Sequence, residues 1–231
     1  MPVAVVTGAS KGLGGALARG LAREGWDLVL GARTAGELGE SARRAGLHGT
    51  RVRQVAGDVA DAGHRSELVS AARELGGLDL LVNNAGALGA QPLVPLAELS
   101  LEGFRTALEV NAVAALGLVQ EALPLLRRSP AGAVLAVSSD AAVEAYGTWG
   151  GYGASKAALE RLVAVLAVEE PGLRAWSVDP GDMDTGMYRA AVPGDRAPRP
   201  APESVVPAFL RLLAERPASG RLVAADLGGA A

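Results

Sequence analysis

Three residues in the second half of the chain can move a proton on and off a carbonyl oxygen. Tyr152 and Lys156 are four residues apart, a spacing that places both side chains on one face of a helix. We expect the Lys156 ammonium to favour ionisation of the phenol and to lower the pKa of Tyr152 toward neutral pH, where general acid–base catalysis operates. Ser139 follows the apolar run 133–137, so we expect it at the C-terminal end of a buried strand, where open α/β sheets bind ligands.

A tyrosine and a lysine at this spacing most often form a surface pair, so the elements around them decide the interpretation. The apolar run 3–6 predicts a buried parallel strand, and the sequence TGASKGLG at 7–14 leads from it into an apolar helix. A strand, a glycine-rich turn and a helix in this order present backbone N–H groups to a pyrophosphate. The glycine spacing is GxxxGxG, which differs from the GxGxxG of the commonest dinucleotide-binding turn.

Apolar strand-like runs alternate with amphipathic stretches along the whole chain, which predicts an α/β fold with a doubly wound parallel sheet. The segment 189–202 contains four prolines and is predicted to be a loop. We expect strands near 3–6, 27–31, 51–56, 78–82, 133–138, 173–178 and 221–224. We expect helices near 12–24, 34–45, 61–75, 101–127, 151–169 and 203–215.

Six motifs resemble, in order and rough spacing, those of the short-chain dehydrogenases/reductases. The glycine pattern resembles the compact oxidoreductase branch of that family, and the patches 83–89, 166–171 and 180–185 look like its sepiapterin- and diketone-reducing members. The resemblance implies a Rossmann-type sheet of seven mainly parallel strands in the order 3-2-1-4-5-6-7, with the cofactor at the switch point between the first and fourth strands. The six motifs are TGxxxGxG at 7–14, Asn83-Asn-Ala-Gly86, Asn111, Ser139, Tyr152xxxLys156, and Pro180-Gly181 with Thr185.

Composition narrows the class of protein further. With 231 residues, 49% of them hydrophobic, and no linker before residue 192, we expect one domain spanning 1–231. A formal net charge of −3 without a long basic run argues against nucleic acid as a partner. The chain has no cysteine, and His48 and His64 lie in predicted surface segments, so we expect no metal site. Because we find no targeting signal and no apolar run near the ~18 residues of a membrane span, we expect a cytoplasmic protein that does not bind a membrane.

The end of the second predicted strand favours NADP(H). Folds that bind NAD usually carry an acidic residue there, about 20 residues past the glycines, whereas an arginine suits a 2′-phosphate. Here Ala32 stands at the acidic position and Arg33 follows it. Lys11, inside the glycine turn, matches the basic residue of the NADP-preferring relatives. The alternatives are that Lys11 is a solvated turn residue and that Arg33 forms a surface ion pair. Two cations, without an acidic residue at position 32, favour binding of the 2′-phosphate.

Other cofactor contacts are implied by the resemblance, residue by residue. Asp58 resembles the family's acceptor for the adenine amine, and its alternative role is to cap a helix that starts near Asp61. Thr185 resembles a contact of the nicotinamide carboxamide and could equally cap a helix. The expected set is Gly8, Ser10, Lys11, Gly12, Leu13, Gly14, Arg33, Asp58, Val59, Asn84, Ala85, Gly86, Tyr152, Lys156, Pro180, Gly181, Met183 and Thr185.

The resemblance also implies a mechanism of direct hydride transfer between the nicotinamide and a substrate carbon. Tyr152 would protonate the nascent alkoxide, Ser139 would hydrogen-bond the same oxygen, Lys156 would bind the nicotinamide ribose, and Asn111 would anchor a proton-supplying water. Asn111 could instead bend its long helix by bonding backbone. Ser138 competes for the serine role, but Ser139 has the family's spacing of thirteen residues to Tyr152.

The substrate is expected to be a small carbonyl compound or alcohol, apolar or aromatic. We expect pocket walls from Leu88 to Gln91, from Ala141 to Trp149 (with Val143, Tyr146 and Trp149 as its large side chains) and from the loop after Thr185. Residues 186–202 are predicted to form a mobile lid. The alternatives are an enzyme that reduces an imine or catalyses dehydration or isomerisation, and a non-catalytic NADP sensor. Surplus apolar residues in 112–119 and 159–168 predict a homodimer or homotetramer.

Overall fold

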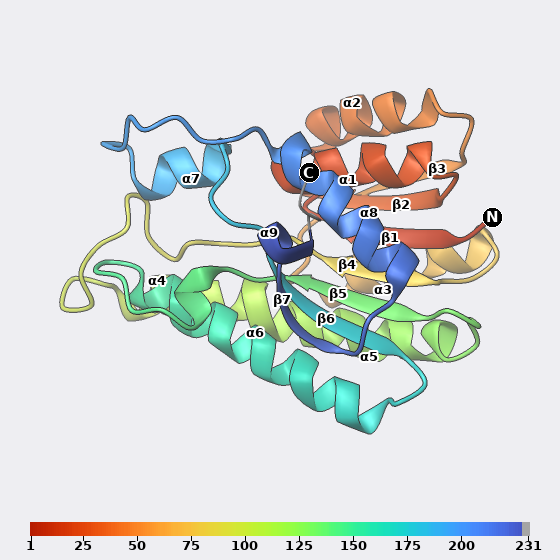
Figure 1. The fold of residues 1–231 in the computed structure, drawn as a ribbon. Helices are drawn as coiled ribbons and strands as arrows, with labels where there is room; N and C mark the ends of the chain where they lie inside the picture. The colour runs from red at the N-terminus through yellow and green to blue at the C-terminus, as the bar shows by residue number, and fades with distance from the viewer. Residues whose placement is uncertain (228–231) are drawn as a thin grey trace.

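A seven-stranded parallel sheet forms the centre of the molecule in the computed structural model, which describes residues 1–227 (Figure 1). The strand order is β3-β2-β1-β4-β5-β6-β7, so the predicted Rossmann-type α/β fold is confirmed. The order reverses between β1 and β4, which is where such sheets bind their ligands. The strands are β1 (Val3–Thr7), β2 (Asp27–Ala32), β3 (Val52–Ala56), β4 (Leu80–Asn83), β5 (Ala133–Val137), β6 (Arg174–Asp179) and β7 (Gly220–Val223).

Helices cover both faces of the sheet because successive strand side chains point to opposite faces. In β1, Ala4 and Val6 belong to the core under α1, α2 and α8, whereas Val3 and Val5 belong to the core under α3 and α5 (Figure 1). Helix α6 packs on the same face as α5, farther along the sheet. The main helices are α1 (Gly12–Arg23), α2 (Ala35–Gly46), α3 (Ala62–Glu74), α4 (Leu101–Leu108), α5 (Ala114–Leu126), α6 (Gly150–Glu169), α7 (Gly186–Ala191), α8 (Val206–Glu215) and α9 (Ala224–Leu227).

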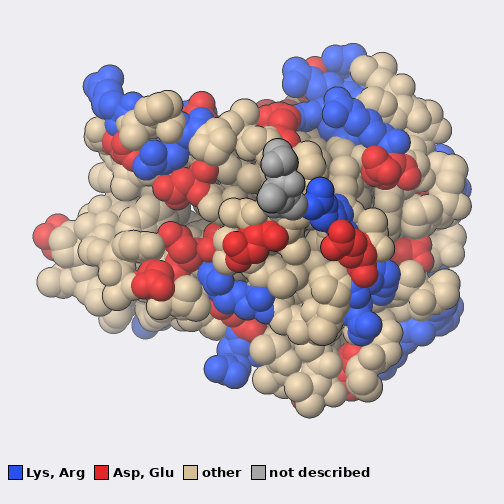
Figure 2. Space-filling model, viewed as in Figure 1, with Lys and Arg blue, Asp and Glu red and all other residues tan. Residues whose placement is uncertain are grey.

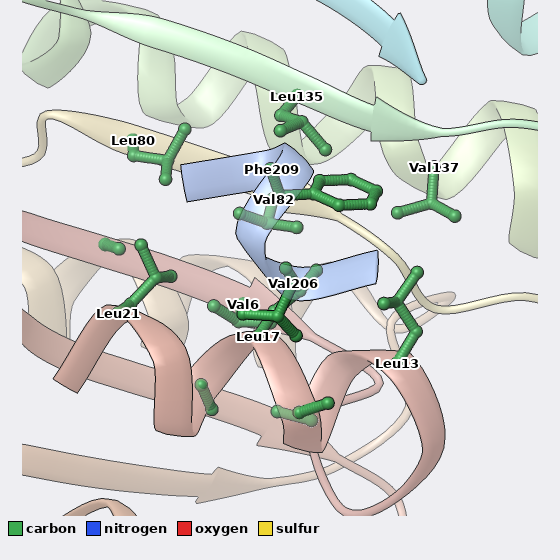
Figure 3. Close-up of a cluster of buried hydrophobic side chains, with 14 of the residues drawn as sticks. Val6, Leu13, Leu17, Leu21, Leu80, Val82, Leu135, Val137, Val206 and Phe209 are labelled. Atoms are coloured by element: carbon green, nitrogen blue, oxygen red, sulfur yellow. The ribbon is translucent and has the colours of Figure 1, made fainter. Parts of the chain in front are cut away.

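Helix α8 closes one of the two cores against α1. Its residues Val206 and Phe209 lie among Val6 of β1 and Val82 of β4 (Figure 3). A Cβ atom on Gly20 of α1 would stand 2.5 Å from the Val206 Cγ1 atom, so the two helices approach as closely as a glycine allows. This packing holds the carboxyl ends of β1 and β4, and the turn that follows β1, in fixed positions.

The predicted long helix 101–127 is interrupted by a π-helical turn, Glu109–Val113, between α4 and α5. Asn111 lies in this turn, and π-turns of this kind occur frequently at functional sites. The whole run Leu101–Leu126 has the length and mean hydropathy, 1.3, of a membrane span. It packs on the sheet through Leu118 and Leu125, as the core helix of a globular domain does. Because this run has the length and hydropathy of a span but packs on the sheet, the absence of membrane binding stays a prediction.

The predicted loop 189–202 starts three residues too early, because α7 extends to Ala191. All four prolines of the segment come after that residue, so they do not hinder the helix. Thr185 caps α7, with its Oγ1 accepting a hydrogen bond from the Tyr188 backbone N–H at 3.1 Å. After the loop, a 3₁₀ turn at Pro202–Val205 leads into α8. Among the described residues on the face shown in Figure 2, acidic and basic side chains are interspersed, without a continuous basic stripe.

Candidate active site

A cleft of about 570 Å³ runs along the carboxyl ends of the strands, on both sides of the switch point. It is lined by every residue of the predicted cofactor set and by Ser139, so the fold brings together seven separate segments of sequence. Asn111 lies behind this cleft and borders a separate small cavity of about 10 Å³, which is about the room that one water molecule needs.

The glycine turn after β1 is held by the end of β4. The Thr7 hydroxyl donates a hydrogen bond to the Val82 carbonyl at 3.2 Å and accepts from the backbone N–H groups of Asn84 and Ala85, both at 3.0 Å. The Asn84 amide donates to the Thr7 carbonyl at 2.8 Å. Asn84 therefore shapes the turn through its side chain, and the turn's shape depends on two strands that lie far apart in sequence.

Glycine is required in this turn for two different reasons. Gly8 and Gly12 have φ angles of +63° and +55°, in the left-handed region that side chains disfavour. Gly14 has an ordinary backbone, but a Cβ atom on it would stand 2.4 Å from the Gly8 carbonyl oxygen. The turn thus leaves its backbone free to approach a ligand closely at the N-terminus of α1, where N–H groups and the helix dipole favour an anion.

The two cations that the sequence places near a 2′-phosphate both line the cleft. Arg33 is exposed, whereas the Lys11 ammonium lies 3.0 Å from the Glu37 carboxylate in the first turn of α2. Sequence analysis offered a surface ion pair as the alternative for Arg33, but it is Lys11 that forms one, with Glu37, a partner that sequence analysis missed. Both side chains are largely solvated, 70% exposed for Lys11 and 44% for Glu37, so the pair is weak and can be displaced.

Asp58 and His64 line the cleft after β3. Asp61, not Asp58, caps α3 by accepting from the backbone N–H groups of Gly63 and His64, so the capping alternative for Asp58 is wrong. The Asp58 carboxylate accepts only from the Ala60 backbone N–H, at 2.9 Å, among the contacts of the described chain. His64 was predicted at the surface, yet it is buried against Gly57, and burial lowers its pKa. No group of three or more potential metal ligands occurs within residues 1–227.

Tyr152 and Lys156 lie together on α6 at the centre of the cleft, both buried. The Lys156 Nζ atom stands 5.6 Å from the centroid of the Tyr152 ring and donates to the Val137 carbonyl at 2.7 Å. Trp149 packs edge-on against the Tyr152 ring, with centroids 5.7 Å apart. The predicted shared helix face is therefore confirmed.

The predicted lowering of the Tyr152 pKa is wrong for the protein alone. Burial raises the pKa of Tyr152, and the carboxylates of Asp140 and Asp179 raise it further. Burial also lowers the pKa of Lys156 to about 8, which weakens the very cation that was expected to stabilise the phenolate. The sequence reasoning counted the charge of Lys156 and left out the desolvation of both groups.

Ser139 and Ser138 point to different partners, as strand alternation predicts. The Ser138 hydroxyl is buried and donates to the Glu160 carboxylate of α6 at 2.5 Å. The Ser139 hydroxyl donates to the Asp140 carboxylate at 3.0 Å and accepts from the Ala141 backbone N–H at 3.2 Å. The Ser138 hydroxyl is thus occupied by a partner in the protein interior. Ser139 is the serine whose hydroxyl bonds a carboxylate that lines the cleft, that of Asp140.

Asn111 is fully engaged by its neighbours. Its Oδ1 accepts from the Ala87 N–H at 2.8 Å, and its Nδ2 donates to the Ala87 carbonyl at 2.9 Å and to the Ser155 hydroxyl at 2.7 Å. These contacts tie the π-turn to the segment after β4 and to α6. They match the alternative role of Asn111 as a residue that shapes its helix, although the small cavity beside it leaves the water role a prediction.

The segment after β6 closes the other side of the cleft. The Asp179 carboxylate accepts from the Gly181 N–H at 3.0 Å and holds a turn in which Gly181 has a φ of +73°. The Thr185 methyl stands 3.7 Å from the point where a Cβ on Gly12 would lie, so this segment faces the glycine turn directly. Thr185 both caps α7 and lines the cleft, so the two roles left open for it do not exclude each other.

The substrate end of the cleft differs from the prediction. Trp149, Leu88 and Gln91 line it, but Val143 and Tyr146 do not; they are 57% and 47% exposed because residues 143–147 turn outward after a short 3₁₀ helix. From the segment after Thr185 come Met187, Tyr188, Ala190 and Ala191. Arg199 of the loop bonds Tyr188, Asp182 and Asp195.

The sequence profile described as short chain dehydrogenase matches residues 2–195 of the chain. The chain belongs to the short-chain dehydrogenase family. Its relatives include cis-4-hydroxycyclohexanecarboxylate dehydrogenase of Sinomonas cyclohexanicum, 36% identical over 198 residues that cover 84% of this chain and 77% of that protein.

Two solved structures of short-chain dehydrogenases illustrate the similarity. The alcohol dehydrogenase of the archaeon Thermococcus sibiricus, complexed with 5-hydroxy-NADP, has a TM-score of 0.87 at 31% identity and covers 96% of this chain and 95% of that one. A short chain dehydrogenase of Shigella flexneri complexed with NADP has a TM-score of 0.89 at 28% identity over 97% of each chain. The protein is accordingly an oxidoreductase of this family, whose solved members include NADP complexes.

In this short-chain dehydrogenase, the polar groups of the cleft that sequence analysis missed include Asp140, His64 and Glu37. Asp140 could have been found, because it directly follows Ser139. Glu37 carried a weaker signal, as an acidic residue in the first turn of the helix after Arg33. The burial of His64 depends on Gly57 and Gly31, whose missing side chains make room for the imidazole, and no local pattern indicates that contact.

Proposed function

We propose that the protein is an NADP(H)-dependent oxidoreductase that transfers a hydride between the nicotinamide and the carbonyl or alcohol carbon of a small substrate. The observation that carries the proposal is a single continuous cleft. It joins an anion-binding glycine turn, with Lys11 and Arg33 at one end, to Tyr152, Lys156 and Ser139 at the other. The relatives' complexes with NADP and 5-hydroxy-NADP support the same cofactor class.

The residues of the cleft fit such a dinucleotide. Glycines at 8 and 14 leave the backbone of the turn accessible, and the N-terminus of α1 favours the pyrophosphate. Asp58 would accept a hydrogen bond from the adenine amine, and the turn at Pro180-Gly181 would hold the nicotinamide. Bound NADPH supplies the hydride that reduces the substrate carbon.

The protein's own groups handle the proton. In reduction the Tyr152 hydroxyl donates its proton to the substrate oxygen, and the Ser139 hydroxyl turns from Asp140 to hydrogen-bond that oxygen. Lys156 uses one of its three N–H donors on the Val137 carbonyl and keeps two for ribose hydroxyls. Because burial raises the Tyr152 pKa, the phenol retains the proton that reduction of a carbonyl requires.

Turnover tests this function directly. We expect NADPH oxidation with members of a panel of aldehydes, ketones, diketones and imines. Tyr152→Phe should abolish it while NADPH still binds, because only the transferable proton is lost. Titration calorimetry of NADPH binding to Tyr152→Phe is the control, because an affinity like that of the natural protein shows that the variant is folded and its cleft intact. Retained activity in Tyr152→Phe would assign the acid–base role to another group.

Imine reduction is a second candidate, favoured by Asp140. Its carboxylate accepts from Ser139 and lines the substrate end of the cleft, where it would stabilise the positive charge of a protonated imine. Faster turnover of cyclic imines than of matched ketones, lost in Asp140→Asn, would select this activity over carbonyl reduction.

A further inference from the structure

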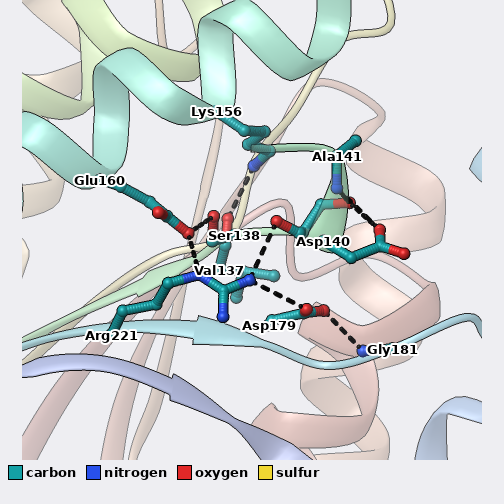
Figure 4. A network of polar contacts seen from close by, with 10 residues as sticks. Val137, Ser138, Asp140, Ala141, Lys156, Glu160, Asp179, Gly181 and Arg221 are labelled. Atoms are coloured by element: carbon teal, nitrogen blue, oxygen red, sulfur yellow. Dashed lines mark hydrogen bonds and ion pairs between the residues drawn. The ribbon is translucent and has the colours of Figure 1, made fainter. Parts of the chain in front are cut away.

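Arg221 connects three segments that line the cleft from a position outside it (Figure 4). It lies on the edge strand β7, and its Nε atom donates to the Glu160 carboxylate of α6 at 3.0 Å. Its Nη2 atom donates to the Asp179 carboxylate at 3.2 Å and to the Ser139 carbonyl at 3.5 Å. One guanidinium therefore joins α6, the end of β6 and the segment after β5.

Each partner of Arg221 is joined to a group with a proposed chemical role. Glu160 lies one helical turn after Lys156 and accepts from the Ser138 hydroxyl. Asp179 holds the Gly181 N–H through its other carboxylate oxygen. The Ser139 carbonyl belongs to the proposed oxygen-binding serine itself. These contacts therefore set the distances between Ser139, helix α6 and the turn at 180–181.

The contacts are shielded enough to fix this spacing. The carboxylates are well buried, with Asp179 6% and Glu160 14% exposed, and the Arg221 side chain is 28% exposed. Without the guanidinium, two negative groups on α6 and β6 would face each other with no cation between them, and each would attract water or move apart. The guanidinium reaches the two carboxylates through different nitrogen atoms, a geometry that a single point charge reproduces only in part.

We propose that Arg221 is a positioning residue that sets the separation of Ser139, helix α6 and the 179–181 turn, and thereby controls the rate of the chemical step. The inference rests on the proposed function. Small displacements of reacting groups cost rate far more than they cost binding, so the effect belongs in kcat and not in KM.

The matched control is Arg127, which pairs with Glu170 at the far end of the same helix α6. Arg127→Met removes an arginine–glutamate contact between α5 and α6 of the same type, away from the cleft. Arg221→Met should lower kcat about tenfold with the KM values for NADPH and substrate within about twofold of the natural protein. Arg221→Lys should recover part of the loss, and Arg127→Met should leave kcat unchanged.

Amide hydrogen exchange provides a readout that does not need turnover. Exchange of residues 139–142 and 179–185 should accelerate in Arg221→Met and Arg221→Lys, and stay as in the natural protein in Arg127→Met. If the natural protein turns over no carbonyl or imine with NADPH, the proposed function fails and the exchange result still decides the positioning role. Equal exchange in all variants, or the same loss of kcat in Arg221→Met and Arg127→Met, would overturn the inference.

Discussion

Substitutions of the two members of the Lys11–Glu37 pair should change the affinity for NADPH in opposite directions. A 2′-phosphate bound between Lys11 and Arg33 must compete with the Glu37 carboxylate, which lies 3.0 Å from the Lys11 ammonium. Exposed ion pairs contribute up to about 1 kcal/mol, a factor of about five in affinity. Lys11→Ala should therefore weaken NADPH binding about threefold to fivefold. Glu37→Gln removes a like charge and frees Lys11, so it should strengthen NADPH binding about twofold to threefold.

Titration calorimetry with NADPH and NADH measures both effects. NADH lacks the 2′-phosphate, so neither change should alter its affinity by more than about twofold, and added salt should shrink the NADPH differences by screening. Arg43→Ala is the control, because Arg43 pairs with Glu40 on the same helix α2 outside the cleft. Equal weakening of NADPH and NADH by Lys11→Ala, or weaker NADPH binding in Glu37→Gln, would refute the assignment of this pair to the phosphate.

Three further outcomes are expected. Residues 186–202 should exchange amide hydrogens more slowly once NADPH and substrate are bound, and equal protection in the free and bound states would make them a passive loop. Light scattering at micromolar concentration should show at least a dimer, which Val168→Asp should weaken because that side chain is 79% exposed on α6; a monomeric natural protein would contradict this. Burial lowers the Lys156 pKa from 10.5 to about 8, so the unfolded chain binds more protons between these values and the free energy of unfolding should rise with pH across them. Chemical denaturation at pH ~8 and ~9.5 should show that rise in the natural protein and not in Lys156→Met.

The strands and the glycine turn could be predicted because they depend on local patterns, whereas the strand order and the set of cofactor-lining residues came from the family resemblance. Buried parallel strands are short apolar runs, and the glycine turn must carry glycines whatever surrounds it. The π-turn at Asn111 could not be predicted, because it is stabilised by Ala87 and Ser155, which lie far from it in sequence.

The electrostatics of the cleft were predicted least well. The sign of the Tyr152 pKa shift depends on how much water the fold removes from the phenol and from Lys156, and composition carries no measure of that. Val143 and Tyr146 were assigned to the pocket from their place after Ser139, yet the chain turns them outward. Contacts across the sheet edge, such as those of Arg221, join residues with no shared motif and were not predicted at all.

The dependence of the glycine turn on β4 has a consequence for folding on the ribosome. Thr7 and Asn84 are 77 residues apart, and their hydrogen bonds give the turn its shape. A nascent chain that ends before residue 80 contains the complete TGASKGLG sequence but lacks β4 and Asn84, which support the turn. Early folding intermediates should therefore not bind the nucleotide. Binding should appear only when β1 and β4 have paired, so the onset of cofactor binding would report that the two halves of the central sheet have joined.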